Sequence, residues 1–159
     1  MTEATFALLK PEAIPRGLVG EIVRRLEEAG PRLAALQMRA PSRELAARHY
    51  GPEIADRYGE DVRQWLLDYL VSGPVVALVL VGEDAVRVVR RASGEAADPP
   101  ECAPGTIRYD LSDDTRAAAM AEGRVLRNLI HTADSPAAAR CEIALWFGEG
   151  LAATLPTAD

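Results

Sequence analysis

The chain has 159 residues, of which 48% are hydrophobic and 26% charged, and its formal net charge is −6 at pH 7. This composition excludes a chain that is disordered over most of its length, and the negative charge argues against a protein that binds nucleic acid by neutralising phosphates. The length suits one domain with its own hydrophobic core, so we expect a single domain over residues 1–159, with a core over about 5–147 and a short tail over 148–159.

The first part of the chain predicts two strands and two helices. Residues 5–9 form a short apolar run that ends at Lys10, and its length favours a buried strand. Over residues 18–29 the apolar side chains recur on one helical face, which predicts a helix. Residues 33–38 predict a second strand, and Ser42 supplies an N-cap for a helix that ends near His49 and Tyr50.

The middle of the chain predicts the most buried strand. Residues 62–70 carry apolar side chains at helical spacing and predict a helix on the core. Residues 75–81 form a continuous and mostly β-branched run, which is typical of a central strand covered on both faces. A helix is expected over 83–92. Residues 94–114 are rich in Pro, Gly and Asp, and they predict a long irregular loop, which in a compact domain is usually functional or disordered.

The last part of the chain predicts a short exposed helix over 115–122, a fourth strand over 125–131, and a helix over 137–147. Ser135 and Pro136 supply the N-cap and the first-turn proline of this last helix. The predicted elements run strand, helix, strand, helices, strand, helix, loop, strand and helix. This order is that of an α+β protein in which helices cover one sheet.

The sequence contains neither a membrane span nor an export signal. There is no run of about eighteen apolar residues, and residues 1–5 lack the basic and apolar blocks of a signal peptide. The two cysteines, Cys102 and Cys141, are far apart and lie outside any zinc-binding spacing. We therefore expect a cytoplasmic protein with reduced thiols and no membrane partner.

His131 is the candidate reactive residue, because a neutral imidazole is an available nucleophile near neutral pH. The alternative from the residue alone is a buried, hydrogen-bonded structural histidine. Glycine motifs that bind phosphate through the backbone are missing, so a nucleotide would have to be bound by side chains. The candidates for that role are Lys10, Arg90, Arg108 and Asn128. His49, the other histidine, is expected to be a structural or surface residue at a helix end.

Eight stretches of the sequence, in this order, resemble the nucleoside diphosphate kinase family. They are residues 5–11, 16–22, 49–50, 72–77, 104–108, 127–131, 134–135 and 142–147. Each stretch alone would be a weak signal, but together they are highly specific. The resemblance implies a ferredoxin-like βαββαβ fold, with an antiparallel four-stranded sheet covered by helices, extra helices, and a long loop before the catalytic histidine.

The resemblance also implies a ping-pong reaction between nucleoside tri- and diphosphates. His131 matches the family's nucleophile, which takes the gamma-phosphate as phosphohistidine, and Glu142 matches the carboxylate on its other nitrogen. The nucleotide-binding positions implied in this way are Lys10, Tyr50, Val62, Leu66, Arg90, Arg108 and Asn128. Of these, Val62 lies in the base-stacking region, which Tyr58 could occupy instead, and Leu66 lines it.

No protein site for a metal is implied by the resemblance. Mg²⁺ would arrive on the nucleotide's phosphates, and Asp134 would contact it only through water. The resemblance further implies a homo-oligomer, in which dimers assemble into a tetramer or a hexamer.

The sequence departs from the family pattern at supporting residues. Ala133 replaces a serine that hydrogen-bonds near the histidine and the glutamate, which would remove about 1 kcal/mol of positioning. Ala96 replaces a threonine that touches phosphate. The chain has a few extra residues between Tyr50 and Ser72 and a longer insertion between Asp110 and Arg127. These changes motivate an alternative function, a catalytically weak nucleotide-binding or protein-interaction domain on the same fold.

Overall fold

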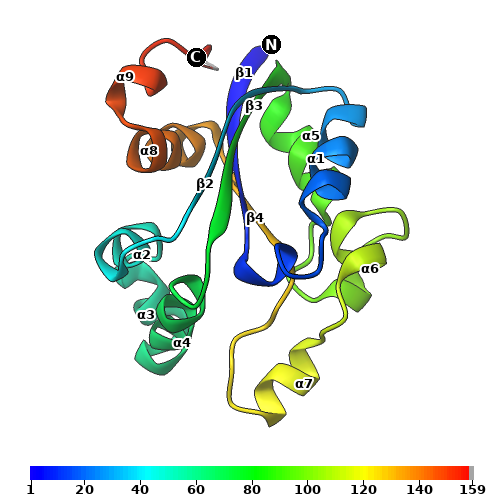
Figure 1. Ribbon diagram of the computed structural model, residues 1–159, viewed down its shortest axis with the longest axis vertical. Helices are drawn as coiled ribbons and strands as arrows, with labels where there is room; N and C mark the ends of the chain where they lie inside the picture. The colour runs from blue at the N-terminus through cyan, green and yellow to red at the C-terminus, as the bar shows by residue number, and fades with distance from the viewer. Residues whose placement is uncertain (158–159) are drawn as a thin grey trace.

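The computed structural model describes residues 1–157 and places one four-stranded sheet at the centre of the molecule (Figure 1). The strand order is β2-β3-β1-β4, and every neighbouring pair is antiparallel. The strands are β1 (Thr2–Leu9), β2 (Arg32–Arg39), β3 (Val75–Glu83) and β4 (Ile130–Thr132). This topology is the expected ferredoxin-like α+β fold, which is confirmed.

Burial explains why β1 and β3 occupy the centre. Seven of the eight residues of β1 are buried, and so are the first seven residues of β3, so both strands are covered on both faces. The predicted central strand over 75–81 is therefore confirmed. In contrast, β2 alternates between exposed and half-buried residues, as an edge strand does when only one of its faces is covered.

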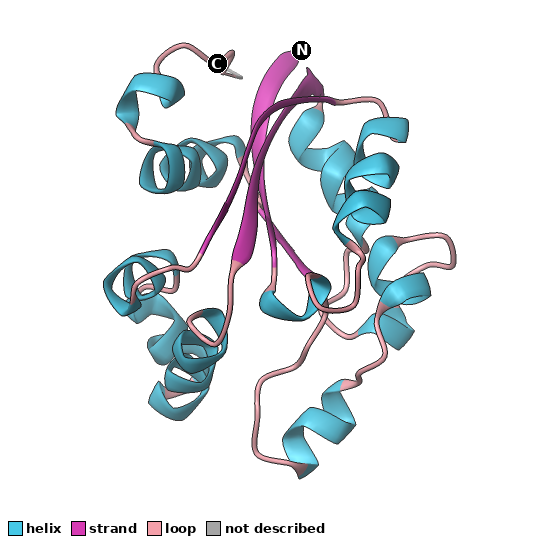
Figure 2. Cartoon of the chain, viewed as in Figure 1, coloured by secondary structure: helices cyan, strands magenta, loops and turns pink. Residues whose placement is uncertain are grey.

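Helices lie on both faces of the sheet (Figure 2). On one face the core contains Ile22 and Leu26 from α1 and Val89 from α5. On the other face the core contains Leu67 from α4 and Trp146 from α8. The helices are α1 (Val19–Glu28), α2 (Arg43–His49), α3 (Pro52–Tyr58), α4 (Glu60–Leu70), α5 (Ala85–Ser93), α6 (Ile107–Leu111), α7 (Arg116–Ala121), α8 (Pro136–Phe147) and α9 (Glu149–Ala152).

Two predicted N-caps are present. The Ser42 hydroxyl accepts a hydrogen bond from the Leu45 amide at 3.1 Å and starts α2. The Ser135 hydroxyl accepts one from the Ala138 amide at 3.2 Å and starts α8, with Pro136 as its first residue. Local capping thus fixes where α8 begins, and the start of α8 determines which of its side chains face β4.

In the third quarter of the chain the structure differs from two predictions in part, although the helix expected over 83–92 is present as α5. The helix expected from residue 83 begins only at Ala85, because Asp84 has a left-handed conformation with φ 47° and Glu83 still pairs with Thr2 in the sheet. The loop expected over 94–114 is not irregular throughout. It contains a 3₁₀ helix, η2 (Pro99–Glu101), and the helix α6, capped by the Thr106 hydroxyl. A local cap such as Thr106 starts a short helix even though the hydrophobic periodicity of this stretch is weak.

The fourth strand is also shorter than predicted. Pairing with β1 begins only at Ile130, whereas the sequence suggested a strand from residue 125. Leu129 has φ 70°, and the Ile130 amide donates to the Asn128 carbonyl at 2.8 Å. This three-residue turn is a strained conformation for a branched side chain, and it interrupts the extended backbone. An apolar pattern could not predict the turn.

The C-terminal segment after Gly148 contains the short helix α9. The tail expected over 148–159 thus includes some regular structure, and its last two residues, 158–159, lie outside the described residues. Within residues 1–157, no helix combines the length and the apolar character needed to cross a membrane.

Candidate active site

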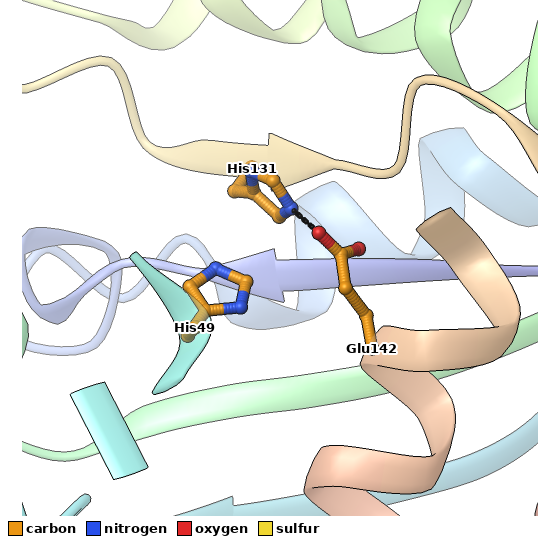
Figure 3. Close-up of side chains that lie close together, drawn as sticks. All are labelled: His49, His131 and Glu142. Carbon is orange, nitrogen blue, oxygen red and sulfur yellow. Dashed lines mark hydrogen bonds and ion pairs between the residues drawn. The ribbon is translucent and has the colours of Figure 1, made fainter. Parts of the chain in front are cut away.

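His131 lies on β4 opposite Leu8 of β1, on the sheet face that α2 and α8 cover. Its Nε2 is 2.8 Å from the Oε1 atom of Glu142, which is two turns into α8 (Figure 3). A carboxylate acceptor holds the imidazole proton on Nε2 and leaves the lone pair on Nδ1. Nδ1 has no hydrogen-bond partner among residues 1–157 and is not among their enclosed polar atoms, so a ligand can reach it.

The surroundings of His131 favour its neutral form. Burial is the main cause that lowers the pKa of His131 to about 3. The positive charges of Lys10 and Arg108, and more weakly of Arg90, act in the same direction, while Asp134 opposes them. At neutral pH the imidazole is therefore uncharged. Its free nitrogen is a nucleophile in positively charged surroundings, which is an arrangement that suits an anionic electrophile.

Lys10 follows β1 directly and is 7% exposed. Its Nζ donates to Oδ1 of Asn128 at 2.5 Å, and the Asn128 amide donates in turn to the Ala97 carbonyl at 2.8 Å. Burial, helped by the Arg108 charge and opposed by Glu12, lowers the pKa of Lys10 to about 8. Lys10 is thus still mostly protonated near pH 7, and it is held beside Asn128 at the end of the sheet.

Backbone carbonyls orient Arg108. One of its terminal nitrogens donates to Gly94 and Ala96 at 2.9 and 2.8 Å, and the other donates to Ile130 at 2.6 Å. Burial lowers the pKa of Arg108. Arg90, on α5, is half-buried and contributes to the same field. Neither arginine forms an ion pair with a carboxylate in the described part of the chain, and an anionic ligand could supply the missing charge.

The turn before β4 connects these groups. The Leu129 amide donates to Oε1 of Glu12 at 2.7 Å, and the Lys10 amide donates to the Leu129 carbonyl at 2.8 Å. The strained Leu129 is completely buried. Its conformation places Asn128 beside Lys10 while His131 pairs with β1. Backbone strain that persists in this way is concentrated at functional sites.

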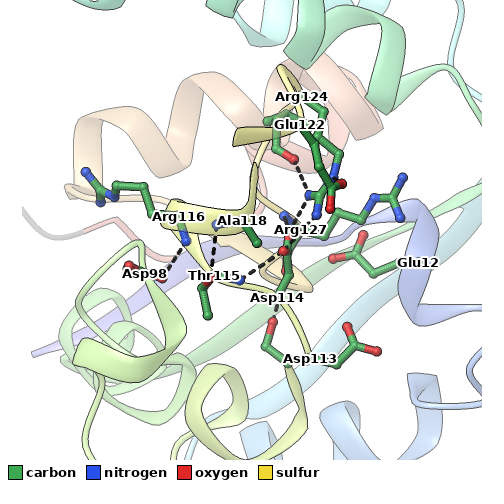
Figure 4. Close-up of polar contacts among 12 residues, drawn as sticks. Glu12, Asp98, Asp113, Asp114, Thr115, Arg116, Ala118, Glu122, Arg124 and Arg127 are labelled. Carbon is green, nitrogen blue, oxygen red and sulfur yellow. Dashed lines mark hydrogen bonds and ion pairs between the residues drawn. The ribbon is translucent and has the colours of Figure 1, made fainter. Parts of the chain in front are cut away.

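The insertion before β4 is fixed by a polar network (Figure 4). Asp114 accepts from both terminal nitrogens of Arg124, at 2.5 and 2.9 Å, and from the Arg127 amide at 2.9 Å. The Arg124 hydrogen bonds are the main cause that lowers the pKa of Asp114 to about 2. Because Arg127 directly precedes Asn128, this network holds the segment that leads into the site.

The remaining predicted residues lie at different distances from His131. Tyr50 is 9% exposed, and its ring centre is 6.4 Å from that of His131. Asp134 is exposed beyond β4 and accepts from the Ser135 hydroxyl at 3.0 Å. Val62 and Leu66 are half-buried on α4.

His49 was expected to be a structural or surface residue, but it lies against His131. The two ring centres are 4.6 Å apart at an interplanar angle of 83°, and donor atoms of His49, His131 and Glu142 all lie within 4.8 Å of one another (Figure 3). Two imidazoles suit zinc better than magnesium, which prefers oxygen ligands. The only sequence signal for His49 was its position next to Tyr50.

Fold and site together define a class: an α+β protein with a neutral, carboxylate-oriented histidine near cations that form no ion pair within residues 1–157. Residues 3–151 match the family model described as "Nucleoside diphosphate kinase". The nucleoside diphosphate kinase of Archaeoglobus fulgidus is 42% identical over 147 residues, which cover 92% of this chain and 87% of the relative. That of Mycobacterium tuberculosis is 42% identical over 147 residues, with 92% and 98% covered.

Solved structures of nucleoside diphosphate kinases resemble this chain as well. A transition-state mimic of nucleoside-diphosphate kinase from Borrelia burgdorferi, with bound vanadate and ADP, superposes with a TM-score of 0.89 at 31% identity and covers 99% of this chain and 92% of that chain. An NDP kinase from Pyrobaculum aerophilum has a TM-score of 0.85 at 35% identity, with 94% and 98% covered. The chain belongs to the nucleoside diphosphate kinase family. It is a phosphotransferase that acts between nucleotides, and the alternative of a catalytically weak nucleotide-binding or protein-interaction domain is not favoured.

Proposed function

We propose that His131 carries the phosphoryl group between the two nucleotides. Nδ1 attacks the gamma-phosphorus of a nucleoside triphosphate, the bond from that phosphorus to the beta–gamma bridging oxygen breaks, and the diphosphate leaves. A second nucleoside diphosphate then attacks the phosphohistidine with a terminal oxygen and restores the free imidazole. The observation that carries this proposal is the accessible Nδ1 of a neutral His131 beside Lys10, Arg90 and Arg108.

The three cations would stabilise the transferring group. Charge spreads over the equatorial phosphoryl oxygens in a loose transition state, so positioned positive charge and hydrogen bonds are the main catalytic contributions of the protein. Arg108 is oriented by three carbonyls, and Lys10 is buried, so both are held in place before the nucleotide binds. Asn128 and Tyr50 would contact the phosphates or the ribose from the same end of the sheet.

Glu142 would hold the histidine in its reactive form. Its bond to Nε2 keeps the proton there, and the carboxylate stabilises the positive charge that the ring gains when Nδ1 is phosphorylated. Burial raises the pKa of Glu142 to about 7, which His49 opposes and Asp134 reinforces. A protonated Glu142 would donate to Nε2 and move the imidazole proton to Nδ1. The reactive tautomer therefore needs the ionised carboxylate.

Mg²⁺ would be held by the nucleotide's phosphates, where it neutralises the charge that develops on the leaving diphosphate. Asp134, exposed at the end of β4, would reach the ion through water. Val62 and Leu66 on α4 would meet the base with apolar contacts. The Borrelia burgdorferi relative is described with vanadate and ADP bound, which supports a shared site for nucleotide and phosphoryl group.

The expectations about assembly and location stay predictions. We propose a homo-oligomer built from dimers, as a tetramer or a hexamer, and sedimentation at the working concentration would distinguish the two. The single domain over residues 1–159 and the cytoplasmic location likewise rest on the sequence.

Initial-rate kinetics test the proposed function. Varying MgATP at several fixed concentrations of a deoxynucleoside diphosphate should give parallel double-reciprocal lines, because the first product leaves before the second substrate reacts. His131→Gln should abolish turnover but still bind MgADP in calorimetry, which controls for folding. Intersecting lines, or residual turnover in His131→Gln, would contradict the phosphohistidine route.

A further inference from the structure

The hydrogen bonding of His49 determines which of its nitrogens carries the proton. His49 is the last residue of α2, and its Nδ1 is 3.3 Å from Nε1 of Trp146 on α8. An indole nitrogen can only donate, so Nδ1 of His49 is the acceptor. A neutral imidazole has one ring proton, which must then lie on Nε2. Burial lowers the pKa of His49 to about 3, consistent with the neutral ring.

Two enclosed atoms near His131 have no hydrogen-bond partner among the described residues, and one is a donor while the other is an acceptor. Nε2 of His49 is a donor, Oε2 of Glu142 is an acceptor, and both are closed to solvent without a hydrogen bond among the described residues. One ring nitrogen of His49 and one carboxylate oxygen of Glu142 lie within 4.8 Å of each other in the cluster of Figure 3. Buried polar groups are almost always hydrogen-bonded, and these two unpaired atoms are chemically complementary.

The neighbourhood offers Glu142 few other partners. On β4 and just beyond it lie His131, already bonded to Oε1, and the carboxylate of Asp134. Ala133, buried between them, has no polar side-chain atom. A hollow of about 340 Å³ between α2 and α8 is lined by Arg48, His49, Glu53, Cys141 and Glu142, but it leaves Oε2 enclosed. Among residues 1–157, Nε2 of His49 is therefore the only donor of this cluster that is enclosed and has no hydrogen-bond partner.

We propose that His49 is a positioning residue: its Nε2–H donates to Oε2 of Glu142 and holds the carboxylate ionised and aimed at His131. The inference rests on the proposed function, because it concerns the carboxylate that serves the phosphoryl carrier. The resulting chain of contacts runs from Trp146 through His49 and Glu142 to His131.

The reaction makes this hydrogen bond useful. When Nδ1 accepts the phosphoryl group, the ring becomes positively charged, and an ionised Glu142 stabilises it. Burial disfavours the ionised carboxylate, whereas a hydrogen bond to the charged form favours it. Oε2 thus needs a donor in the phosphorylated state most of all. Because His49 is neutral, it can supply that donor without adding a further positive charge.

Two substitutions at position 49 separate the hydrogen bond from packing. His49→Asn keeps an acceptor near the position of Nδ1 for Trp146 but has no group at the position of Nε2. His49→Gln extends an amide donor to that position. In single-turnover experiments with MgATP, the Asn variant should phosphorylate His131 roughly 10-fold more slowly than the Gln variant, since a hydrogen bond to a charged group is removed. The affinity for MgADP should be the same in both.

The pH profile is the second measurement. Without the donor the pKa of Glu142 rises, so the acidic limb of the phosphorylation rate should move to higher pH in His49→Asn and return towards the wild-type position in His49→Gln. Equal rates and equal acidic limbs in the two variants would overturn the inference, whether both are slow or both are fast. If the wild-type chain forms no phosphohistidine, the proposed function itself fails. Failure of the Asn–Gln difference alone leaves that function standing.

Discussion

Burial of an uncharged His131 among cations should make the folded protein sensitive to acid. Replacing it with Gln removes the titrating ring while keeping a polar group for Glu142. In the folded chain, burial and the charges of Lys10, Arg108 and Arg90 keep the pKa of His131 at about 3, against an ordinary value of 6.5 in the unfolded chain. Between these values the unfolded chain binds the proton and the folded chain does not, so stability decreases as the pH falls through 6.5.

The size of the effect follows from the same two pKa values. A shift of one pKa unit corresponds to about 1.36 kcal/mol, so lowering the pH to about 5, which is roughly 1.5 units below 6.5, should cost the wild-type chain about 2 kcal/mol at this residue. His49 and Glu142 also titrate, but both are present in the variant. Between pH 7.5 and pH 5 the free energy of unfolding of the wild type should therefore fall by about 2 kcal/mol relative to that of His131→Gln.

Urea unfolding of the two chains at both pH values, at matched protein concentration because the protein is proposed to be an oligomer, gives this difference directly. His131→Gln should gain stability relative to the wild type in acid, although it loses activity. A wild-type–variant difference that is the same at the two pH values would refute the reasoning, because it would mean that His131 takes up its proton as easily in the folded chain as in the unfolded one.

Three further predictions concern activity. Because burial lowers the pKa of Lys10 to about 8, kcat/KM for MgATP should fall above about pH 8 as the free enzyme loses this charge. In the same pH series, kcat/KM of Lys10→Met should lack this alkaline fall. Arg90→Gln should lower kcat/KM by roughly 10-fold or more through the loss of a charged phosphate contact, whereas Arg91→Gln, the exposed neighbour on α5, should stay close to wild type in the same assay. Ala133→Ser should raise turnover or leave it unchanged, and the gain should reach about 5-fold if the added hydroxyl orients the site through one hydrogen bond. A large fall in steady-state turnover would show that the hydroxyl disturbs the site.

The sequence predicted those parts of the fold that depend on local patterns. The β-branched run of β3 and the capping residues Ser42 and Ser135 identified elements that the structure confirms. The shortened β4 was not predictable, because the turn at Leu129 is bonded to Glu12 and Lys10, which are more than a hundred residues away in sequence. Such long-range contacts leave no periodic signal.

In the site, too, some features could be predicted from the sequence and others depend on how distant segments pack. The pairing of His131 with Glu142 and of Lys10 with Asn128 agrees with the grouping expected from the family resemblance. The position of His49 beside His131 was missed, since it depends on how α2 packs against α8, and a residue at a helix end carries no periodic pattern. The contact of Val62 with the base stays a prediction, because it depends on a nucleotide.

The central claim is that His131 holds the phosphoryl group as a covalent intermediate. Incubation with MgATP, removal of nucleotide and intact-mass measurement should detect one acid-labile phosphoryl adduct on the wild-type chain and none on His131→Gln. Addition of a nucleoside diphosphate to the isolated adduct should release it as triphosphate. An adduct that is absent from the wild type, that persists in His131→Gln, or that the diphosphate cannot discharge would contradict the account.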